Sequence, residues 1–178
     1  MSELEADKLL NFPHPRINKK MFGHESSKNI FIKSLKKNKL HHAWLIHGPK
    51  GVGKATLAWK IIKLLQNGLH NFDQIEDENK LSLTTRRIEA LSEQSVLLCR
   101  RQFDKTKKKL LQEISVNEIR KINHFFSLSN TISKYRIVII DTINELSISA
   151  SNALLKLLEE PPLDLSLIHI SEPTRRVR

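Results

Sequence analysis

The clearest chemical signal is a glycine-rich segment that joins an apolar run to a helical pattern. It reads GPKGVGK from Gly48 to Lys54 and follows the run Ala43 to Ile46, which is typical of a buried strand. Apolar residues then recur at helical spacing from Leu57 to Leu65. Glycines in such a turn let backbone N–H groups converge on a phosphate, and the helix N-terminus adds partial positive charge. The segment predicts a phosphate-binding loop (P-loop) in which Lys54 reaches the β- and γ-phosphates of a nucleotide.

One position of the loop departs from the usual pattern. The residue after Lys54 is Ala55, where a Ser or Thr hydroxyl normally holds Mg²⁺. Thr56 follows, but one step along a helix turns a side chain by about 100°. We therefore expect the loop to bind ATP phosphates while holding Mg²⁺ only weakly.

A second strand supplies the acid that nucleotide sites of this kind use. The run Arg136 to Ile140 is apolar after its first residue and ends at Asp141, as a Walker B strand does. A hydrolysing enzyme of the Asp-Glu type has glutamate next, but here the residue is Thr142, and Glu145 lies three residues further on, in an expected loop. This pattern predicts binding without hydrolysis, with no catalytic residue and no protein metal ligand. The candidate nucleotide-binding residues are Gly48, Pro49, Lys50, Gly51, Val52, Gly53, Lys54, Ala55, Thr56 and Asp141.

The elements around this site alternate between helix and strand. Helical spacing is expected over 25–39, 115–127 and 148–158, and further apolar strand patterns lie at 95–99 and 136–140. Within the second helix, Ser115 and Glu118 fit a capping box. Of the segments that connect these elements, residues 70–93 are expected to form a surface excursion, and residues 100–109 a basic hairpin or loop. The alternation predicts an α/β fold: a parallel sheet with helices on both faces.

Composition narrows the class of protein. The 178 residues carry a formal net charge of +11, which favours polyanionic partners or merely keeps a small domain soluble. The single cysteine, Cys99, excludes a disulfide framework and a cysteine-rich zinc site, and we expect it to be a buried small hydrophobe. The sequence shows neither an apolar run of membrane-spanning length nor a secretory signal. A cytoplasmic location is the default expectation.

Three segments together resemble a known family. They are HHAWL from His41, GPKGVGKATLA from Gly48, and NALLKLLEEPP from Asn152 to Pro162. These are similar to the N-terminal AAA+ P-loop module of bacterial DNA polymerase III clamp-loader subunits, the delta prime and gamma/tau group. EISVNEIRKINHFF from Glu113 to Phe126 is most similar to delta prime. The resemblance covers about residues 20 to 162.

The resemblance implies a role and a set of partners. It implies a subunit that works with gamma/tau and delta subunits, and through that complex with the sliding clamp and primed DNA, without a membrane. In this family gamma/tau subunits are the motors, whereas delta prime is generally regarded as not hydrolysing ATP, which Ala55 and Thr142 fit. Many relatives carry a four-cysteine zinc module, which a chain with one cysteine cannot form, so no zinc is expected.

The end of the chain departs from the family. We expect an N-terminal extended arm at 1–24, the AAA+ domain at 25–162, and an atypical tail at 163–178. The tail contains SLIHISEPTRR, which resembles the translated read-through of a sequencing adapter and predicts a truncated or chimeric reading frame. Leu165 to Ile170 could pass as a strand, but nothing after it resembles the family. The domain is then expected to stop before the lid and collar domains and to lack the last strand of its sheet.

Two alternative functions stay open at this point. One is an active clamp-loader ATPase of the gamma/tau type, against which Ala55 and Thr142 count. The other is a basic nucleic-acid-binding module with a vestigial P-loop, which predicts salt-dependent DNA binding without a nucleotide effect. Two groups of basic residues could contact DNA or partner subunits, or could simply form a solvated surface. They are the stretch Arg100 to Lys109, and the pair Arg120 and Lys121.

Overall fold

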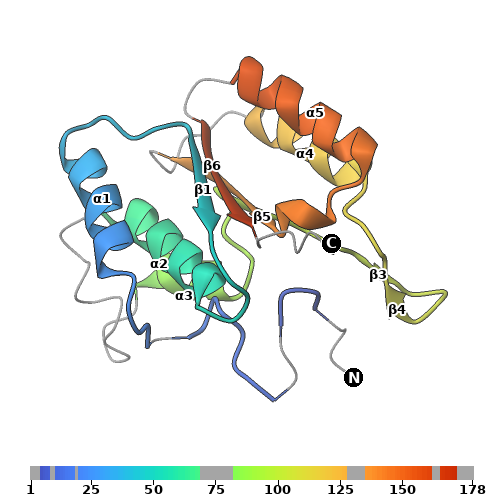
Figure 1. The fold of residues 1–178 in the computed structure, drawn as a ribbon, viewed down its shortest axis with the longest axis horizontal. Helices are drawn as coiled ribbons and strands as arrows, with labels where there is room; N and C mark the ends of the chain where they lie inside the picture. Colours follow the sequence, from blue (N-terminus) through green and yellow to red (C-terminus); the bar gives the residue numbers. More distant parts are fainter. Residues whose placement is uncertain are drawn as a thin grey trace, which may run out of the picture.

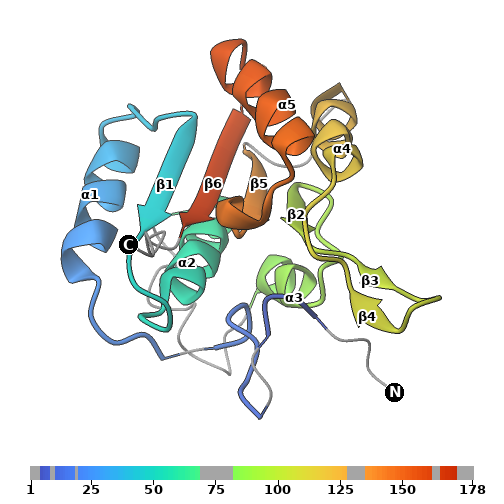
Figure 2. The same ribbon diagram turned by 45° about the vertical axis from the view of Figure 1, so that its right-hand side comes forward.

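A parallel sheet forms the centre of the molecule. The computed structural model describes residues 5–8, 11–18, 20–68, 82–127, 135–161 and 165–171. Within these residues, four parallel strands pair in the order β1-β6-β5-β2, which can be followed in Figure 2. Their bounds are Ala43–His47 for β1, Val96–Arg100 for β2, Arg136–Asp141 for β5 and Leu165–Ser171 for β6.

Helices cover both faces of this sheet, as the alternating pattern predicts. Figure 1 shows α1, α2 and α3 on one side and α4 and α5 on the other. The connection from β2 to α4 carries a short hairpin, β3 paired with β4, and a 3-10 turn, η4, precedes α5. The bounds are Glu25–Lys36 (α1), Lys54–Asn67 (α2), Leu83–Glu89 (α3), Phe103–Asp104 (β3), Lys109–Leu110 (β4), Val116–Ser127 (α4), Ile143–Glu145 (η4) and Ile148–Glu159 (α5). No helix of the described residues is long and apolar enough to cross a lipid bilayer.

The alternation of side chains along β5 divides the core in two. Ile137 and Ile139 pack with the α1–α2–α3 layer, whereas Val138 and Ile140 pack with the α4–α5 layer. All four side chains are fully buried. A strand buried on both faces must be apolar at every position, which explains why this segment reads as a continuous apolar run.

Residues 165–171 differ most from the expectation. They form β6, which lies between β1 and β5, with Ile168 level with Trp44 on one side and Ile139 on the other. Leu167, Ile168 and Ile170 are buried, so the segment has the composition that an interior parallel strand needs. The expectation that Leu165 to Ile170 could pass as a strand is confirmed, and this part of the tail is an interior strand of the sheet. Residues 162–164 and 172–178 lie outside the described residues.

The N-terminal arm is folded against the domain rather than extended. His14 Nε2 lies 2.9 Å from Asp7 Oδ2, and both side chains are almost fully buried. Arg100, at the end of β2, pairs with Asp7 and, at 3.1 Å, with Glu5 Oε1. Burial alone would raise the pKa of each carboxyl, but His14 and Arg100 beside Asp7, and Arg16 and Arg100 beside Glu5, hold both pKa values below their ordinary range. The arm is therefore held by ion pairs to the sheet edge.

The two residue-level expectations for α4 and β2 have different outcomes. Glu118 does not close the predicted capping box; its carboxylate accepts a hydrogen bond from Gln102 Nε2 at 3.2 Å and pairs with Lys121 Nζ at 2.5 Å. Cys99 is buried, as expected, with 1% of its surface exposed. Burial, with a smaller contribution from the charge of Glu118, raises the pKa of its thiol to about 12.

A pair of isoleucine variants tests the double core. Ile139→Ala removes a fully buried side chain from the middle of β5 and should destabilise the fold by about 2–5 kcal/mol, because the surrounding layers cannot close the cavity. Ile148→Ala changes a side chain that is 84% exposed at the start of α5 and should alter stability by less than about 0.5 kcal/mol. Urea unfolding followed by circular dichroism measures both. Equal effects of the two substitutions would contradict the assigned burial.

Candidate functional site

The predicted P-loop lies between β1 and α2. β1 ends at His47 and α2 begins at Lys54, so the loop spans six residues that start at Gly48. Gly51 has φ = 84° and Gly53 has φ = 93°, a left-handed conformation that residues with a Cβ adopt at a cost. A Cβ at Gly51 would meet no atom within 4 Å, so the loop backbone faces open space there. Pro49 and Lys50 are exposed, and Val52 is 42% exposed.

Lys54 is folded back beneath this loop. Its side chain is buried, and its Nζ donates hydrogen bonds to the carbonyl oxygens of Gly48 at 2.8 Å and Pro49 at 2.6 Å. Helix α2 has no side-chain N-cap and no acidic residue in its first turn, so its N-terminal N–H groups keep their partial positive charge. An ammonium group and a helix N-terminus thus meet at one loop. This donor set suits the oxygens of a phosphate group.

A histidine that the sequence analysis does not select also contacts the loop. His24 Nε2 lies 2.6 Å from the carbonyl oxygen of Val52, and a Cβ on Gly53 would lie 3.6 Å from the same nitrogen. His24 is the N-cap of α1. A sequence pattern can suggest the helix start, but it carries no signal that residue 24 meets residue 52.

Strand register brings Asp141 to the same edge of the sheet. Asp141 is level with Ile170 of β6, and Ile170 is level with Ile46 of β1, two residues before the loop. Two strand spacings separate β1 from β5, which is about 10 Å. The intervening strand ends at Ser171, whose hydroxyl donates to Asn144 Oδ1 at 3.1 Å. Neither Ser171 nor Asn144 stands out in the sequence, because only the order of the strands places them between the loop and Asp141.

The carboxyl group of Asp141 has an unusual protonation equilibrium. Burial, and then the nearby charges of Asp7 and Glu145, raise its pKa to about 6. The hydroxyl of Thr142 acts against this rise by donating to Asp141 Oδ1 at 3.0 Å. The folded arm thus brings a second carboxylate, Asp7, close to the candidate site, an arrangement that the sequence does not reveal.

The residues near Asp141 offer little for activating a water molecule. Thr142 has a hydroxyl, and it is engaged with Asp141. Glu145 lies in η4 rather than in an irregular loop, and its Oε2 is 2.7 Å from Arg101 Nε. The carboxylate of Glu145 is thus engaged by Arg101 and does not contact the Asp141 carboxyl group through any hydrogen bond among the described residues.

The metal-binding position of the loop is also weak in the structure. Ala55 packs against the core layer of α1 and α2, and Thr56 is buried within α2, with 7% of its surface exposed. No group of three or more His, Cys, Asp or Glu side chains suited to a metal ion occurs among the described residues. The N–H and ammonium donors at this edge suit phosphate oxygens.

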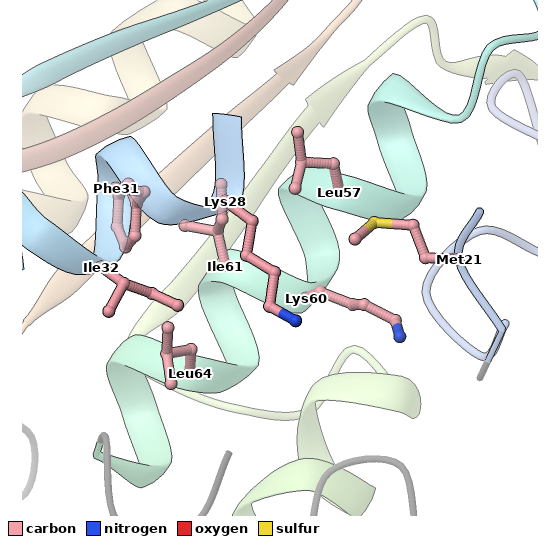
Figure 3. Close-up of a pocket in the computed structure, with 8 residues that line it drawn as sticks. All are labelled: Met21, Lys28, Phe31, Ile32, Leu57, Lys60, Ile61 and Leu64. Atoms are coloured by element: carbon pink, nitrogen blue, oxygen red, sulfur yellow. The ribbon is translucent and has the colours of Figure 1, made fainter. Parts of the chain in front are cut away.

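A small apolar cavity elsewhere does not compete for the nucleotide. Figure 3 shows the residues that line it, which come mainly from α1 and α2 and include Lys28 and Lys60. Its free volume is about 10 Å³, enough for about one water molecule. Its lining is completed by Met21, Phe31, Ile32, Leu57, Ile61 and Leu64.

Comparison with known proteins identifies the family. The family model described as "DNA polymerase III, delta subunit" matches residues 23–177, and the chain belongs to that family. DNA polymerase III subunit gamma of Buchnera aphidicola subsp. Schizaphis graminum is 30% identical, with 86% of this chain and 39% of that protein covered. Subunit delta' of Bacillus subtilis is 27% identical, with 83% of this chain and 41% of that protein covered.

A solved structure also aligns with this chain. It is a gamma subunit-related protein from Thermotoga maritima, with a TM-score of 0.45 and 19% identity over 80% of this chain and 39% of that chain. The chain thus spans about two fifths of the length of the relatives named here. The resemblance inferred from the sequence is confirmed at the level of the family.

The raised pKa of Asp141 makes a testable prediction about stability. In the unfolded chain the Asp141 carboxyl group ionises near the ordinary pKa of an aspartate, whereas in the folded chain it ionises only near pH 6. The free energy of unfolding therefore decreases between about pH 4 and pH 6. Above pH 6 this loss of stability persists. Asp141→Asn should therefore stabilise the fold at pH 8, by on the order of 2 kcal/mol. At pH 4 the variant and the wild type should be nearly equal.

Thermal unfolding in metal-free buffer at both pH values measures this difference. The pH 4 comparison is the internal control, because the carboxyl group is protonated there in the folded chain. A variant that is less stable than the wild type at pH 8 would show that the ionised carboxylate is stabilised, not strained, in the fold.

Proposed function

We propose that this chain is a delta prime-like subunit of the DNA polymerase III clamp loader that binds ATP and does not hydrolyse it. In this role it helps load the sliding clamp onto primed DNA in the cytoplasm, in a complex with gamma/tau and delta subunits. The observation that carries the proposal is a contrast at one edge of the sheet. Lys54 and the start of α2 supply donors that suit a phosphate, whereas the positions expected for metal binding and water activation hold Ala55 and Thr142.

The contacts of Lys54 support the binding half of the proposal. Its ammonium group already lies at the loop, where two carbonyl oxygens accept its hydrogen bonds. A phosphate oxygen entering the loop offers a charged acceptor in place of a neutral one, and charge-assisted hydrogen bonds are roughly twice as strong as neutral ones. The N–H groups at the start of α2 add further donors. The other candidates, Gly48 to Gly53, shape the loop backbone around the phosphates.

The non-hydrolysing half rests on what surrounds Asp141. The residue after it is a threonine, and the next carboxylate along the chain, Glu145, is paired with Arg101. Ala55 has no hydroxyl to offer Mg²⁺. Such a subunit acts through its contacts with neighbouring subunits rather than through its own chemistry.

An active gamma/tau-like ATPase is the second candidate, because gamma subunits are among the relatives that match this chain. The two candidate functions both require ATP binding and differ in whether the bound ATP is hydrolysed. A basic nucleic-acid-binding module with a vestigial P-loop differs from both, because its DNA binding would depend on salt and not on nucleotide.

Calorimetric titration with Mg-ATP tests the binding half. Lys54→Ala should weaken ATP binding at least about tenfold, equivalent to about 1.4 kcal/mol, because it removes the ammonium group that lies against the loop carbonyl oxygens of Gly48 and Pro49. Lys39→Ala removes an exposed lysine outside the loop and is the matched control, with unchanged affinity expected. Loss of affinity in both variants, or in neither, contradicts the assigned role of Lys54.

Phosphate release by the wild-type chain tests the other half, with Thr142→Glu measured alongside. We expect no steady turnover by the wild type. Steady ATP hydrolysis that Lys54→Ala abolishes would overturn the silent-subunit proposal in favour of the motor. Absence of any nucleotide binding would favour the vestigial P-loop.

Removal of Mg²⁺ gives an independent prediction. Because Ala55 offers no hydroxyl to Mg²⁺, chelation of the metal by EDTA should change the ATP affinity of the wild type by less than about threefold. In the Ala55→Thr variant, removal of Mg²⁺ should weaken ATP binding by about fivefold or more. Competition with a fluorescent ATP analogue measures the affinities. A strong Mg²⁺ dependence in the wild type would show that another group of the chain holds the metal.

A further inference from the structure

The β3–β4 hairpin concentrates positive charge on a projecting part of the fold. From Phe103 to Leu110 it contains a single acidic residue, Asp104, and four exposed lysines: Lys105, Lys107, Lys108 and Lys109. Figures 1 and 2 show the hairpin extending away from the sheet and its helices. Its charge is thus presented to solvent on a narrow two-stranded ribbon.

The turn of this hairpin is ordered by its own hydrogen bonds. Asp104 Oδ1 accepts hydrogen bonds from the backbone N–H groups of Thr106 at 2.9 Å and Lys107 at 3.0 Å. These bonds, that of Lys107 first, hold the pKa of Asp104 below its ordinary value. At the base, the N–H of Leu111 donates to the carbonyl oxygen of Gln102 at 2.9 Å. A preformed scaffold reduces the ordering cost when its side chains bind a partner.

The basic stretch that begins at Arg100 divides into two functional parts. Arg100 pairs with Asp7 and Glu5 of the arm, and Arg101 pairs with Glu145. The two arginines are therefore used inside the molecule. None of the ion pairs among the described residues contains Lys107, Lys108 or Lys109, so the charge of these three lysines faces outward.

We propose that the β3–β4 hairpin binds the phosphate backbone of duplex DNA directly. Its lysines are point charges, which suit phosphates without selecting a base sequence. A two-stranded ribbon fits the roughly 12 Å wide major groove of B-DNA, where phosphates flank it on both sides. The one aromatic residue of the hairpin, Phe103, lies in β3, and the turn residues 105–108 include no aromatic side chain that would stack on unpaired bases, so a duplex suits the hairpin better than a single strand. The inference rests on the proposed function for its setting, primed DNA, but the contact itself requires no nucleotide.

Fluorescence anisotropy with a labelled duplex of about 20 base pairs, long enough for several phosphate contacts, tests this contact on the full chain. The hairpin variant carries Lys107→Gln, Lys108→Gln and Lys109→Gln. The matched control carries Lys33→Gln, Lys36→Gln and Lys37→Gln on and just after α1, where all three lysines are also exposed. Both variants lose three positive charges, so they share the same net charge. Equal thermal midpoints confirm that both remain folded.

The hairpin variant should bind the duplex about tenfold more weakly near 100 mM salt, and the slope of log affinity against log salt should fall by about 2–3, because up to three phosphate contacts are lost. The control should keep wild-type affinity and slope. Equal weakening of both variants would show that only overall charge matters, and unchanged binding in the hairpin variant would exclude the contact; each result overturns the proposal.

ATP titration of the same two variants separates this proposal from the proposed function. Retained ATP binding in a hairpin variant that has lost DNA binding supports the contact independently of the P-loop. If the wild type binds the duplex through the hairpin but binds no ATP, the proposed function fails while the hairpin contact stands.

Discussion

The common direction of the strands is the constraint from which the candidate site follows. Because β1, β6, β5 and β2 all run parallel, their carboxyl ends meet at one edge of the sheet. The P-loop, Ser171, Asp141 and Arg100 each follow or end one of these strands, so residues from four separate parts of the chain become neighbours without any long-range sequence signal. Reversal of one strand would move its terminal residue to the opposite edge. The position of the candidate site at this edge is thus a property of the topology, which individual residues then refine.

The N-terminal arm places further charged side chains near that edge of the sheet. Its carboxylates are stabilised by Arg16, Arg100 and His14, yet one of them, Asp7, raises the pKa of the neighbouring Asp141. The Asp7 carboxylate that anchors the arm therefore also increases the cost of ionising Asp141, and the charge of His14 acts in the opposite direction. This is the kind of local conflict that proteins keep at functional sites and offset through packing elsewhere.

Local patterns predict the parts of the molecule that depend on near neighbours in the chain. The P-loop, the apolar strand before Asp141 and the helices on both faces follow from glycine spacing and from hydrophobic periodicity, and a basic hairpin after β2 was one of two expected forms. Contacts between distant segments could not be predicted in this way: nothing in the sequence links His24 to Val52 or Asp7 to His14 and Arg100. Residues 165–171 show a related limit. A six-residue apolar pattern identifies a strand, but only pairing on both sides reveals an interior position between β1 and β5.

The burial of Cys99 has a practical consequence. A thiol with a pKa of about 12 and 1% exposure presents almost no thiolate to solvent at neutral pH, and it is the only cysteine of the chain. Maleimide reagents should therefore leave the native protein unlabelled. A cysteine introduced at an exposed position such as Thr106 would become a unique attachment point for a fluorophore or a spin label. No native cysteine therefore has to be replaced before a single label is attached for spectroscopy.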